Sequence, residues 1–239
     1  MPAPRWAAVV TAAGESTRMG GAKKEFRTIG GVPVLALAVS PFLAAGASRV
    51  VVTLPVGRLA EGAALLAPHL DTATITLVEG GETRQESVRR GLLALATDPP
   101  ELVLIHDGAR PRLAADLLAR VLAAAERHGA CVPVLPAADA VKEVDAVPDG
   151  RPAGGRGAGR EGPAFVRRHL PRHTIMLAQT PQGFSYPRIL AAHERARAEG
   201  LSFADDAEVY DRYAGPVAWV SGDPANRKIT FAHDLEEGA

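Results

Sequence analysis

Residues 7–24 read AAVVTAAGESTRMGGAKK, and this stretch decides much of the fold. The short apolar run Ala7–Thr11 ends in β-branched residues and predicts a buried strand. Alanines and glycines follow it at once, so we expect a tight turn directly after the strand. A strand that runs into a glycine-rich turn is typical of α/β proteins in which the backbone approaches a bound anion.

The same alternation of apolar runs and helical patterns continues along the chain. Further strands are predicted at Arg49–Leu54, Ala73–Val78, Leu102–Ile105, Ala130–Leu135 and Val217–Val220. Helices are predicted at Val32–Ala45, Leu59–Leu70, Arg84–Ala96, Leu113–His128, Tyr186–Glu199 and Asp205–Tyr213, with the start of a short one at His233–Glu237. Because the strands lack polar alternation, the pattern predicts an α/β fold with a mostly parallel, Rossmann-like sheet and helices on both faces, in one domain of residues 1–239.

Residues 137–172 interrupt this alternation. Within them Asp149–Pro163 contains six Gly, three Arg and two Pro and no core-forming residue, which predicts a mobile loop. Short β-like stretches flank it, at Ala140–Val144 and Ala164–Arg168. We therefore expect a hairpin arm that projects from the body; a disordered surface insertion is the alternative.

Composition excludes several classes of protein. Lys+Arg 27 balances Asp+Glu 27, which disfavours a strongly basic nucleic-acid binder. The only cysteine, Cys131, excludes an internal disulfide and a multi-cysteine zinc site, and it lies in an apolar run that predicts burial. The first apolar run is too short for a membrane span or a signal peptide. We therefore expect a cytoplasmic protein with no membrane partner.

Four polar clusters follow predicted strand ends, where open α/β sheets bind ligands. The first supplies backbone N–H groups for a phosphate, with Arg18 and one of Lys23 and Lys24 as cations; its backbone positions are Ala12, Ala13 and Gly14. Neither a Walker A loop nor a GxGxxG motif is present. A plain surface turn is the alternative.

The second cluster, Glu79–Val88, places a double-glycine turn before a helix. A base or ribose could lie against the backbone of Gly81, with Glu82 in the same turn and Ser87 nearby. An ordinary loop with a helix cap is the alternative interpretation.

The third cluster is HDGARP. Asp107 at the end of a buried strand is costly unless paired or metal-bound, and it is a natural magnesium ligand beside a nucleoside triphosphate. Arg110 could meet an anion. A capping role for Asp107 stays open, and His106 is interpreted as a packing histidine.

The fourth cluster, Gly222–Thr230, contains Lys228. Only four of the 27 basic residues are lysines, so a lysine here can indicate a site that needs a compact charge. Lys142, in the predicted arm, is another of the four. A solvated surface charge remains the alternative for both.

Taken together, the motifs AAGESTRMG, VEGGETRQESV, HDGARP, DAVKEV, AQTPQGF, DDAEVY and GDPANRKIT resemble one family. In this order they are similar to 2-C-methyl-D-erythritol 4-phosphate cytidylyltransferases, over residues 9 to about 235. The resemblance implies transfer of a cytidylyl group from CTP, an alcohol phosphate as acceptor, a divalent ion such as Mg²⁺, and a homodimer formed through the β-arm.

The resemblance also implies roles for individual residues. Those matched to the loop around the CTP phosphates are Ala12, Ala13 and Gly14, and those matched to the cytosine and ribose site are Gly81, Glu82 and Ser87. The catalytic cations would be Arg18, Lys24 and Lys228. Acceptor or phosphate contacts would come from Asp107 (also the metal ligand), Arg110, Arg172 and again Lys228. Arg172 would reach into the site of the partner subunit.

Two positions depart from the family pattern. The chain has Ala140 and Ala204 where the family commonly has threonine. Both departures concern the acceptor and leave the CTP motifs intact, so ribitol 5-phosphate is the alternative acceptor. The chain lacks the glycine motif of nicotinamide-dependent oxidoreductases, which disfavours that class. A non-catalytic nucleotide-binding module is disfavoured too, because it would not need cations from distant segments.

Overall fold

A central twisted sheet organises the chain. The structure is a computed structural model and describes residues 4–14, 23–145, 165–231 and 233–235. Its middle strand is β1 (Trp6–Thr11), which pairs in parallel with β4 (Val50–Leu54) on one side and β6 (Leu102–Asp107) on the other. β5 (Ile75–Glu79) continues the parallel order beyond β4. These strands end at the same edge of the sheet.

The other half of the sheet mixes directions. β11 (Gln182–Ser185) lies antiparallel between β6 and β7 (Ala130–Pro136). β10 (Met176–Ala178) is also antiparallel to β7, and β12 (Ala218–Ser221) is parallel to it. The sheet is therefore mostly parallel, as predicted. The strand β11 was not predicted, because QGFS is short and has no β pattern of its own.

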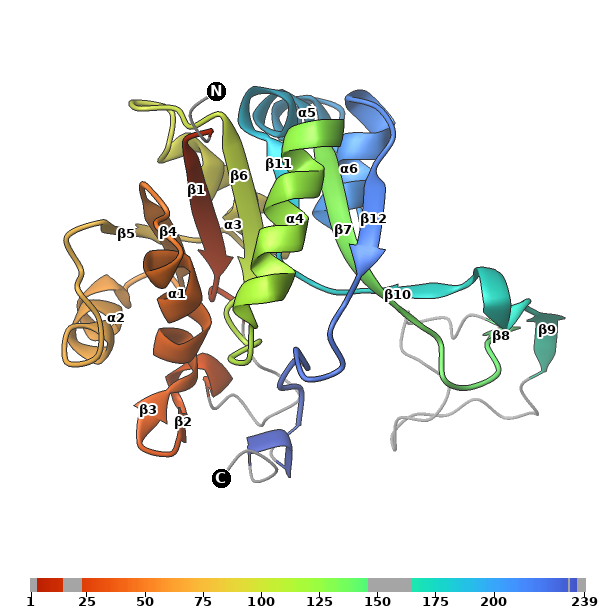
Figure 1. Cartoon of the computed structure of the whole chain (residues 1–239), viewed down its shortest axis with the longest axis horizontal. Coiled ribbons are helices and arrows are strands. Elements are labelled where there is room, and N and C mark those ends of the chain that lie inside the picture. Colours follow the sequence, from red (N-terminus) through yellow and green to blue (C-terminus); the bar gives the residue numbers. More distant parts are fainter. Residues whose placement is uncertain (1–3, 15–22, 146–164, 232, 236–239) are drawn as a thin grey trace.

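Helices cover both faces. One face carries α1 (Val34–Ala44), α2 (Leu59–Leu66) and α4 (Ala115–His128), and the other carries α3 (Arg84–Leu93), α5 (Tyr186–Ala198) and α6 (Asp206–Tyr213) (Figure 1). Alternate residues of the parallel strands face the two layers, so the strands are mostly apolar. This explains why the sequence showed no polar alternation.

The predicted helix at Val32–Ala45 begins two residues late. Val32–Pro33 forms a short strand, β3, that pairs with β2 (Thr28–Ile29). The helix ends at Ala44, before Gly46, whose φ is +81°. None of the described helices is long and apolar enough to cross a membrane.

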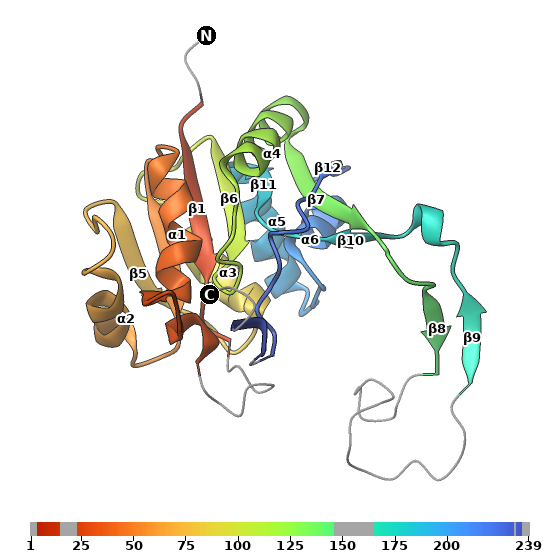
Figure 2. The same ribbon diagram turned by 60° about the horizontal axis from the view of Figure 1, so that its bottom comes forward.

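The predicted arm is present as a two-stranded ribbon. β8 (Lys142–Val144) pairs antiparallel with β9 (Val166–His169), and every residue of both strands is exposed. The ribbon stands away from the body, and a turn of 3₁₀ helix, η3 (Arg172–Thr174), with β10 leads back to the sheet (Figures 1 and 2). The loop predicted at Asp149–Pro163 lies outside the described residues.

Candidate active site

Four loops gather at the edge where the parallel strands end. They follow β1, β5, β6 and β12, and their described parts are residues 12–14, 80–83, 108–112 and 222–230. The C-terminal segment runs past the arrowheads of the strands at this edge (Figure 1). The described parts of all four polar clusters predicted from the sequence therefore lie at one edge of the sheet.

Direct contacts join these loops. The N–H of Gly108 donates to the carbonyl of Thr11 at 2.9 Å, and the N–H of Ile229 donates to the carbonyl of Ala109 at 2.8 Å. A Cβ placed on Gly80 would lie 2.3 Å from the Cβ of Ala13. Glycine is thus required at position 80, because a side chain would push the first two loops apart.

The serine of the second cluster supports its turn. The hydroxyl of Ser87 accepts from the N–H of Gly81 at 3.1 Å and donates to the carbonyl of Thr83 at 2.9 Å. Thr83 in turn caps α3, since its hydroxyl accepts from the N–H of Glu86. The double-glycine turn is therefore preorganised by the first turn of the helix that follows it.

A cavity of about 410 Å³ opens between the first two loops. Ala12, the residue before Ala13, is buried. Five of the residues predicted for a nucleotide line this cavity, namely Ala13, Gly14, Gly81, Glu82 and Ser87. The cavity is large enough for a drug-sized molecule such as a nucleoside.

Three cations from different segments of the chain surround the carboxylate of Asp107, the last residue of β6. Lys228 Nζ lies 2.8 Å from Oδ2 and Arg84 Nε lies 3.2 Å from Oδ1. Arg110 Nε approaches Oδ2 at 3.7 Å. The N–H of Asp107 donates to the hydroxyl of Thr180 at 3.0 Å, which fixes the strand end. The sequence alone did not single out Arg84, because an arginine at a helix start has no distinguishing signal.

The charges determine the ionisation of this group. Burial alone would raise the pKa of Asp107, but Arg84, Lys228 and Arg110 outweigh burial and hold its pKa well below the ordinary value. Burial lowers the pKa of the Arg110 guanidinium. Asp107 is therefore ionised within a cationic site. Its carboxylate can bind a metal ion, or it can pair with the cations when no phosphate is bound.

Arg84 contacts a second carboxylate behind the site. Its Nη1 lies 2.8 Å from Oδ2 of Asp206, the first residue of α6. Oδ1 of Asp206 lies 3.2 Å from Nε2 of His193, and both side chains are almost fully buried. Burial would raise the pKa of Asp206, but Arg84 and His193 hold it below the ordinary value.

The two adjacent lysines have different environments. Lys24, at the start of the 3₁₀ turn η2 (Lys24–Phe26), donates from Nζ to the carbonyl of Ile229 at 2.8 Å, so it lies against the loop that carries Lys228. Lys23 is buried: its Nζ donates to the carbonyl of Gly14 and lies 3.4 Å from Glu25. Burial lowers the pKa of Lys23. Lys23 therefore ties down the first loop, while Lys24 borders the site.

Polar side chains hold the fourth loop in place. The amide of Asn226 donates to the carbonyl of Thr180 at 2.7 Å, and that of Gln179 donates to the carbonyl of Asp223 at 2.9 Å. Arg110 Nη1 donates to the carbonyl of Asn226 at 2.7 Å. These contacts place Lys228 beside Asp107.

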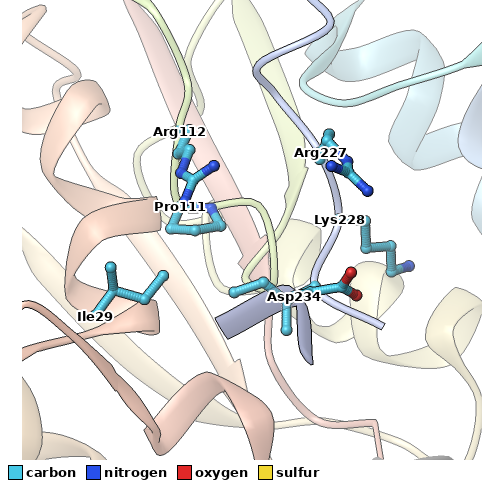
Figure 3. A pocket seen from close by; sticks show the side chains of 7 residues that line it. Ile29, Pro111, Arg112, Arg227, Lys228 and Asp234 are labelled. Atoms are coloured by element: carbon cyan, nitrogen blue, oxygen red, sulfur yellow. The ribbon is translucent and has the colours of Figure 1, made fainter. Parts of the chain in front are cut away.

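A much smaller hollow, of about 20 Å³, adjoins Lys228 (Figure 3). Its lining includes the cations Arg112 and Arg227 and the carboxylate of Asp234. The N–H groups of Phe231 and Thr230 donate to Asp234 and hold its pKa below the ordinary value. Asp234 therefore fastens the segment that follows Lys228.

Two residues interpreted as structural are confirmed as such. His106 is fully buried, with Nε2 3.1 Å from the carbonyl of Arg110 and Nδ1 3.0 Å from the hydroxyl of Thr180. Burial lowers its pKa to about 4, so its imidazole is neutral at pH 7. Cys131 is a buried free thiol, and burial raises its pKa to about 11.

The remaining predicted site residues lie elsewhere. Arg172 belongs to the arm, where Nη1 donates to the carbonyl of Ala138 at 3.0 Å, and Lys142 is exposed on β8. Arg18 lies outside the described residues. Three of the residues predicted to share one cleft lie together: Lys24 and Asp107 both contact the loop that carries Lys228.

Fold and site together define a class: a Rossmann-like α/β protein with a cation-lined site at the carboxyl ends of its parallel strands. The family model described as "2-C-methyl-D-erythritol 4-phosphate cytidylyltransferase" (IspD) matches residues 6–238. The chain belongs to this family.

Relatives and solved structures agree with the family model. The "Bifunctional enzyme IspD/IspF" of Novosphingobium aromaticivorans is 41% identical over 99% of this chain and 56% of its own length. The 2-C-methyl-D-erythritol 4-phosphate cytidylyltransferase of Thermus thermophilus superposes with a TM-score of 0.71 at 34% identity, covering 96% of this chain and 95% of that one. The 4-diphosphocytidyl-2C-methyl-D-erythritol synthase of Anaerococcus prevotii gives 0.79 at 26% identity, covering 99% and 95%. The chain spans about half the length of the curated relatives it matches.

Proposed function

We propose that this protein transfers the cytidylyl group of CTP to 2-C-methyl-D-erythritol 4-phosphate, giving the CDP-alcohol and pyrophosphate, in non-mevalonate isoprenoid precursor biosynthesis. The observation that carries the proposal is the gathering of Arg84, Arg110 and Lys228 around Asp107, next to the glycine-lined cavity. Membership of the family supports the choice of substrates.

The cavity between the first two loops is the proposed nucleotide site. The cytosine and ribose would lie against Gly81, with Glu82 and Ser87 at their edges, and the phosphates would follow the backbone of residues 12–14. The triphosphate would then run toward the cations at Asp107. Backbone N–H groups in such a turn suit a phosphate because they point at the ligand and donate hydrogen bonds to its oxygens.

The reaction needs no protein nucleophile. An oxygen of the acceptor phosphate attacks the α-phosphorus of CTP; the new P–O bond forms as the bond to the β-phosphate oxygen breaks, and pyrophosphate leaves. Both reactants are anions, so the protein lowers the barrier by alignment and charge neutralisation. We assign the neutralisation at the α-phosphate and the leaving group to Arg18 and Lys24, and contacts to the phosphates and the acceptor to Lys228 and Arg110.

The residues present fit a divalent ion that the substrate helps to bind. Asp107 is one hard carboxylate, and no group of three or more His, Cys, Asp or Glu side chains able to hold a metal occurs in the described part of the chain. Mg²⁺ commonly takes one carboxylate and completes its shell with substrate phosphates and water. Asp107 would hold the ion, which would supply charge neutralisation on the triphosphate.

A homodimer formed through the arm is part of the proposal. The ribbon exposes apolar side chains that a second copy could cover, at Val144, Phe165 and Val166, and Met176 and Leu177 are exposed on β10. Arg172 lies in this arm. In the proposed dimer its guanidinium contacts the acceptor phosphate in the partner's site. We also propose the cytoplasm as the compartment, because the one cysteine is a buried, unpaired thiol.

Pyrophosphate release from CTP tests the function directly. With Mg²⁺ present, we expect release only when an acceptor is added, with 2-C-methyl-D-erythritol 4-phosphate preferred over ribitol 5-phosphate. ATP and UTP with the same acceptors serve as controls for the base. A preference for ribitol 5-phosphate would establish the alternative acceptor, and no release with any acceptor would refute the proposed activity.

A further inference from the structure

Arg84 occupies an unusual position for a cation. It is the first residue of α3, where the exposed N–H groups of the helix give a partial positive charge. A guanidinium is disfavoured there unless anions compensate. Two carboxylates do so, Asp107 at 3.2 Å from Nε and Asp206 at 2.8 Å from Nη1.

The same guanidinium faces both parts of the site. The side chain of Arg84 is about one-third exposed (31%) and lines the 410 Å³ cavity, whereas Asp206 is 1% exposed behind it. Arg84 therefore connects the cavity proposed for the nucleotide to the carboxylate proposed for the metal. Arg84, Asp107 and Asp206 come from α3, β6 and α6, so no single segment of the sequence indicates this connection.

Asp206 limits how Arg84 can bind Asp107. An arginine and a carboxylate that are free to turn adopt a bidentate pair, with two parallel N–H···O contacts. Here Asp206 holds Nη1, so only Nε reaches Oδ1 of Asp107. Oδ2 of Asp107 is left to Lys228, at 2.8 Å.

The contacts behind Asp206 are buried and come from two helices. Its Oδ1 lies 3.2 Å from Nε2 of His193, which is fully buried in the middle of α5. Asp206 also begins α6, where a carboxylate is favoured by the positive end of the helix. The adjacent Asp205 caps the same helix by accepting from the N–H of Glu208 at 2.9 Å. Two helices thus fix the position of this carboxylate.

We propose that Asp206 is a positioning residue that acts through Arg84: it keeps the guanidinium from closing on Asp107 and so leaves that carboxylate available for the reaction. This inference rests on the proposed function and adds to it a residue that touches neither substrate. Without Asp206, Arg84 forms a bidentate pair with Asp107 and displaces Lys228 or an incoming cation from it.

Asp206→Asn tests this, because it removes the charge at constant shape. We expect kcat to fall at least about 10-fold, as for lost preorganisation of a charged group, while the Kd for CTP measured by calorimetry changes less than about 3-fold. The decisive comparison is Asp206→Asn in an Arg84→Gln background, where it should cost no further kcat. Equal losses of kcat in both backgrounds would show that Asp206 does not act through Arg84.

A matched control comes from the same helices. Glu194→Gln breaks an ion pair between α5 and α3, Glu194 to Arg89 Nη1 at 2.7 Å, that does not touch Asp107. It should leave kcat and the CTP Kd unchanged. Melting temperatures of all variants show whether a loss of kcat is only a loss of folded protein, and wild-type kcat in a folded Asp206→Asn protein would overturn the proposal.

Arg84→Lys keeps the proposal testable if Asp206→Asn does not fold. It leaves the buried Asp206 near a cation, but a single ammonium cannot bridge two carboxylates in directed geometry. We expect the same pattern, with kcat reduced and the CTP Kd little changed; wild-type kcat would contradict the inference. If the wild type itself releases no pyrophosphate from CTP, the proposed function fails instead, and calorimetry on CTP still reports on the cavity.

Discussion

The carboxylate of Asp107 and the ammonium of Lys228 lie 2.8 Å apart, although the first ends a central strand and the second belongs to the C-terminal loop. The same carboxylate contacts Arg84, the first residue of α3. One buried anion therefore gathers cations that are distant in sequence. A bound polyphosphate would offer these cations a second anion at the same place.

Lys228→Met is expected to lower kcat by about 100- to 1000-fold, the typical loss for a preorganised donor at a developing charge. Its side chain is 41% exposed, so the protein should still fold. Pyrophosphate release measures kcat, and a melting curve measures folding. Arg120→Met, which removes an exposed cation of α4, should change neither. Unchanged turnover in Lys228→Met would refute its role.

The adjacent lysines should differ in what they lose. Lys24→Ala should lower kcat far more than CTP affinity, because Lys24 borders the site. Lys23→Met should chiefly lower stability, by about 3 kcal/mol, since it removes one partner of a buried ion pair. Chemical unfolding and steady-state kinetics on both variants separate the two effects. A reversal of the two outcomes would show that Lys23 is the catalytic cation.

Gly80→Ala should raise the KM for CTP. Its Cβ would lie 2.3 Å from Ala13 and 2.8 Å from the hydroxyl of Ser87, so the two loops that line the cavity must separate. Gly183→Ala is the matched control, because its Cβ would lie 2.9 Å from that of Ala125 in α4, and neither residue lines the cavity. Both should lose stability, but only Gly80→Ala should lose CTP affinity. The same KM in both variants would argue against the cavity as the nucleotide site.

Arg172 should act across the proposed dimer. Arg172→Ala should mainly raise the KM for the acceptor, with little change in the CTP Kd. If the arm serves the partner's site, mixing Arg172→Ala with Lys228→Met subunits restores activity, because one site of each mixed dimer then carries neither change. No recovery in mixed dimers, with exchange verified by differently tagged subunits, would place Arg172 in its own subunit's site or outside any site.

His106 should make stability depend on pH. Burial lowers its pKa to about 4 in the folded protein, whereas an unfolded histidine titrates near about 6.5. Between these values only the unfolded chain binds the proton, so the free energy of unfolding falls as pH drops through this range. The total is on the order of 3 kcal/mol.

Denaturant unfolding of the wild type and of His106→Asn measures this contribution. The measurements run from about pH 7.5 to about pH 4.5, roughly the range over which the histidine would titrate. Acidification should cost the wild type more stability than the variant. Parallel stability curves for the two proteins would show that His106 does not titrate on unfolding.

The strand ends of this protein were predictable from the sequence. Strands of a covered parallel sheet are apolar on both faces, so a change to polar residues marks the point where each strand ends. Asp107 and Lys228 were found in this way. The strand Gln182–Ser185 was not, since its pairing with β6 and β7 imposes a conformation that the four residues do not indicate. Arg84 and Asp206 were missed because each looks like an ordinary helix start, and only the packing of α3 against α5 and α6 brings them together.

The most direct test of the account is a crystal structure with CTP and Mg²⁺. It should place the cytosine and ribose at Gly81 and Ser87 and the triphosphate within hydrogen-bond distance of Lys24 and Lys228, with the ion on Asp107. A triphosphate bound elsewhere, with Asp107 still closed by Lys228 and Arg84, would contradict the central claim that these cations form one site for the reacting phosphates.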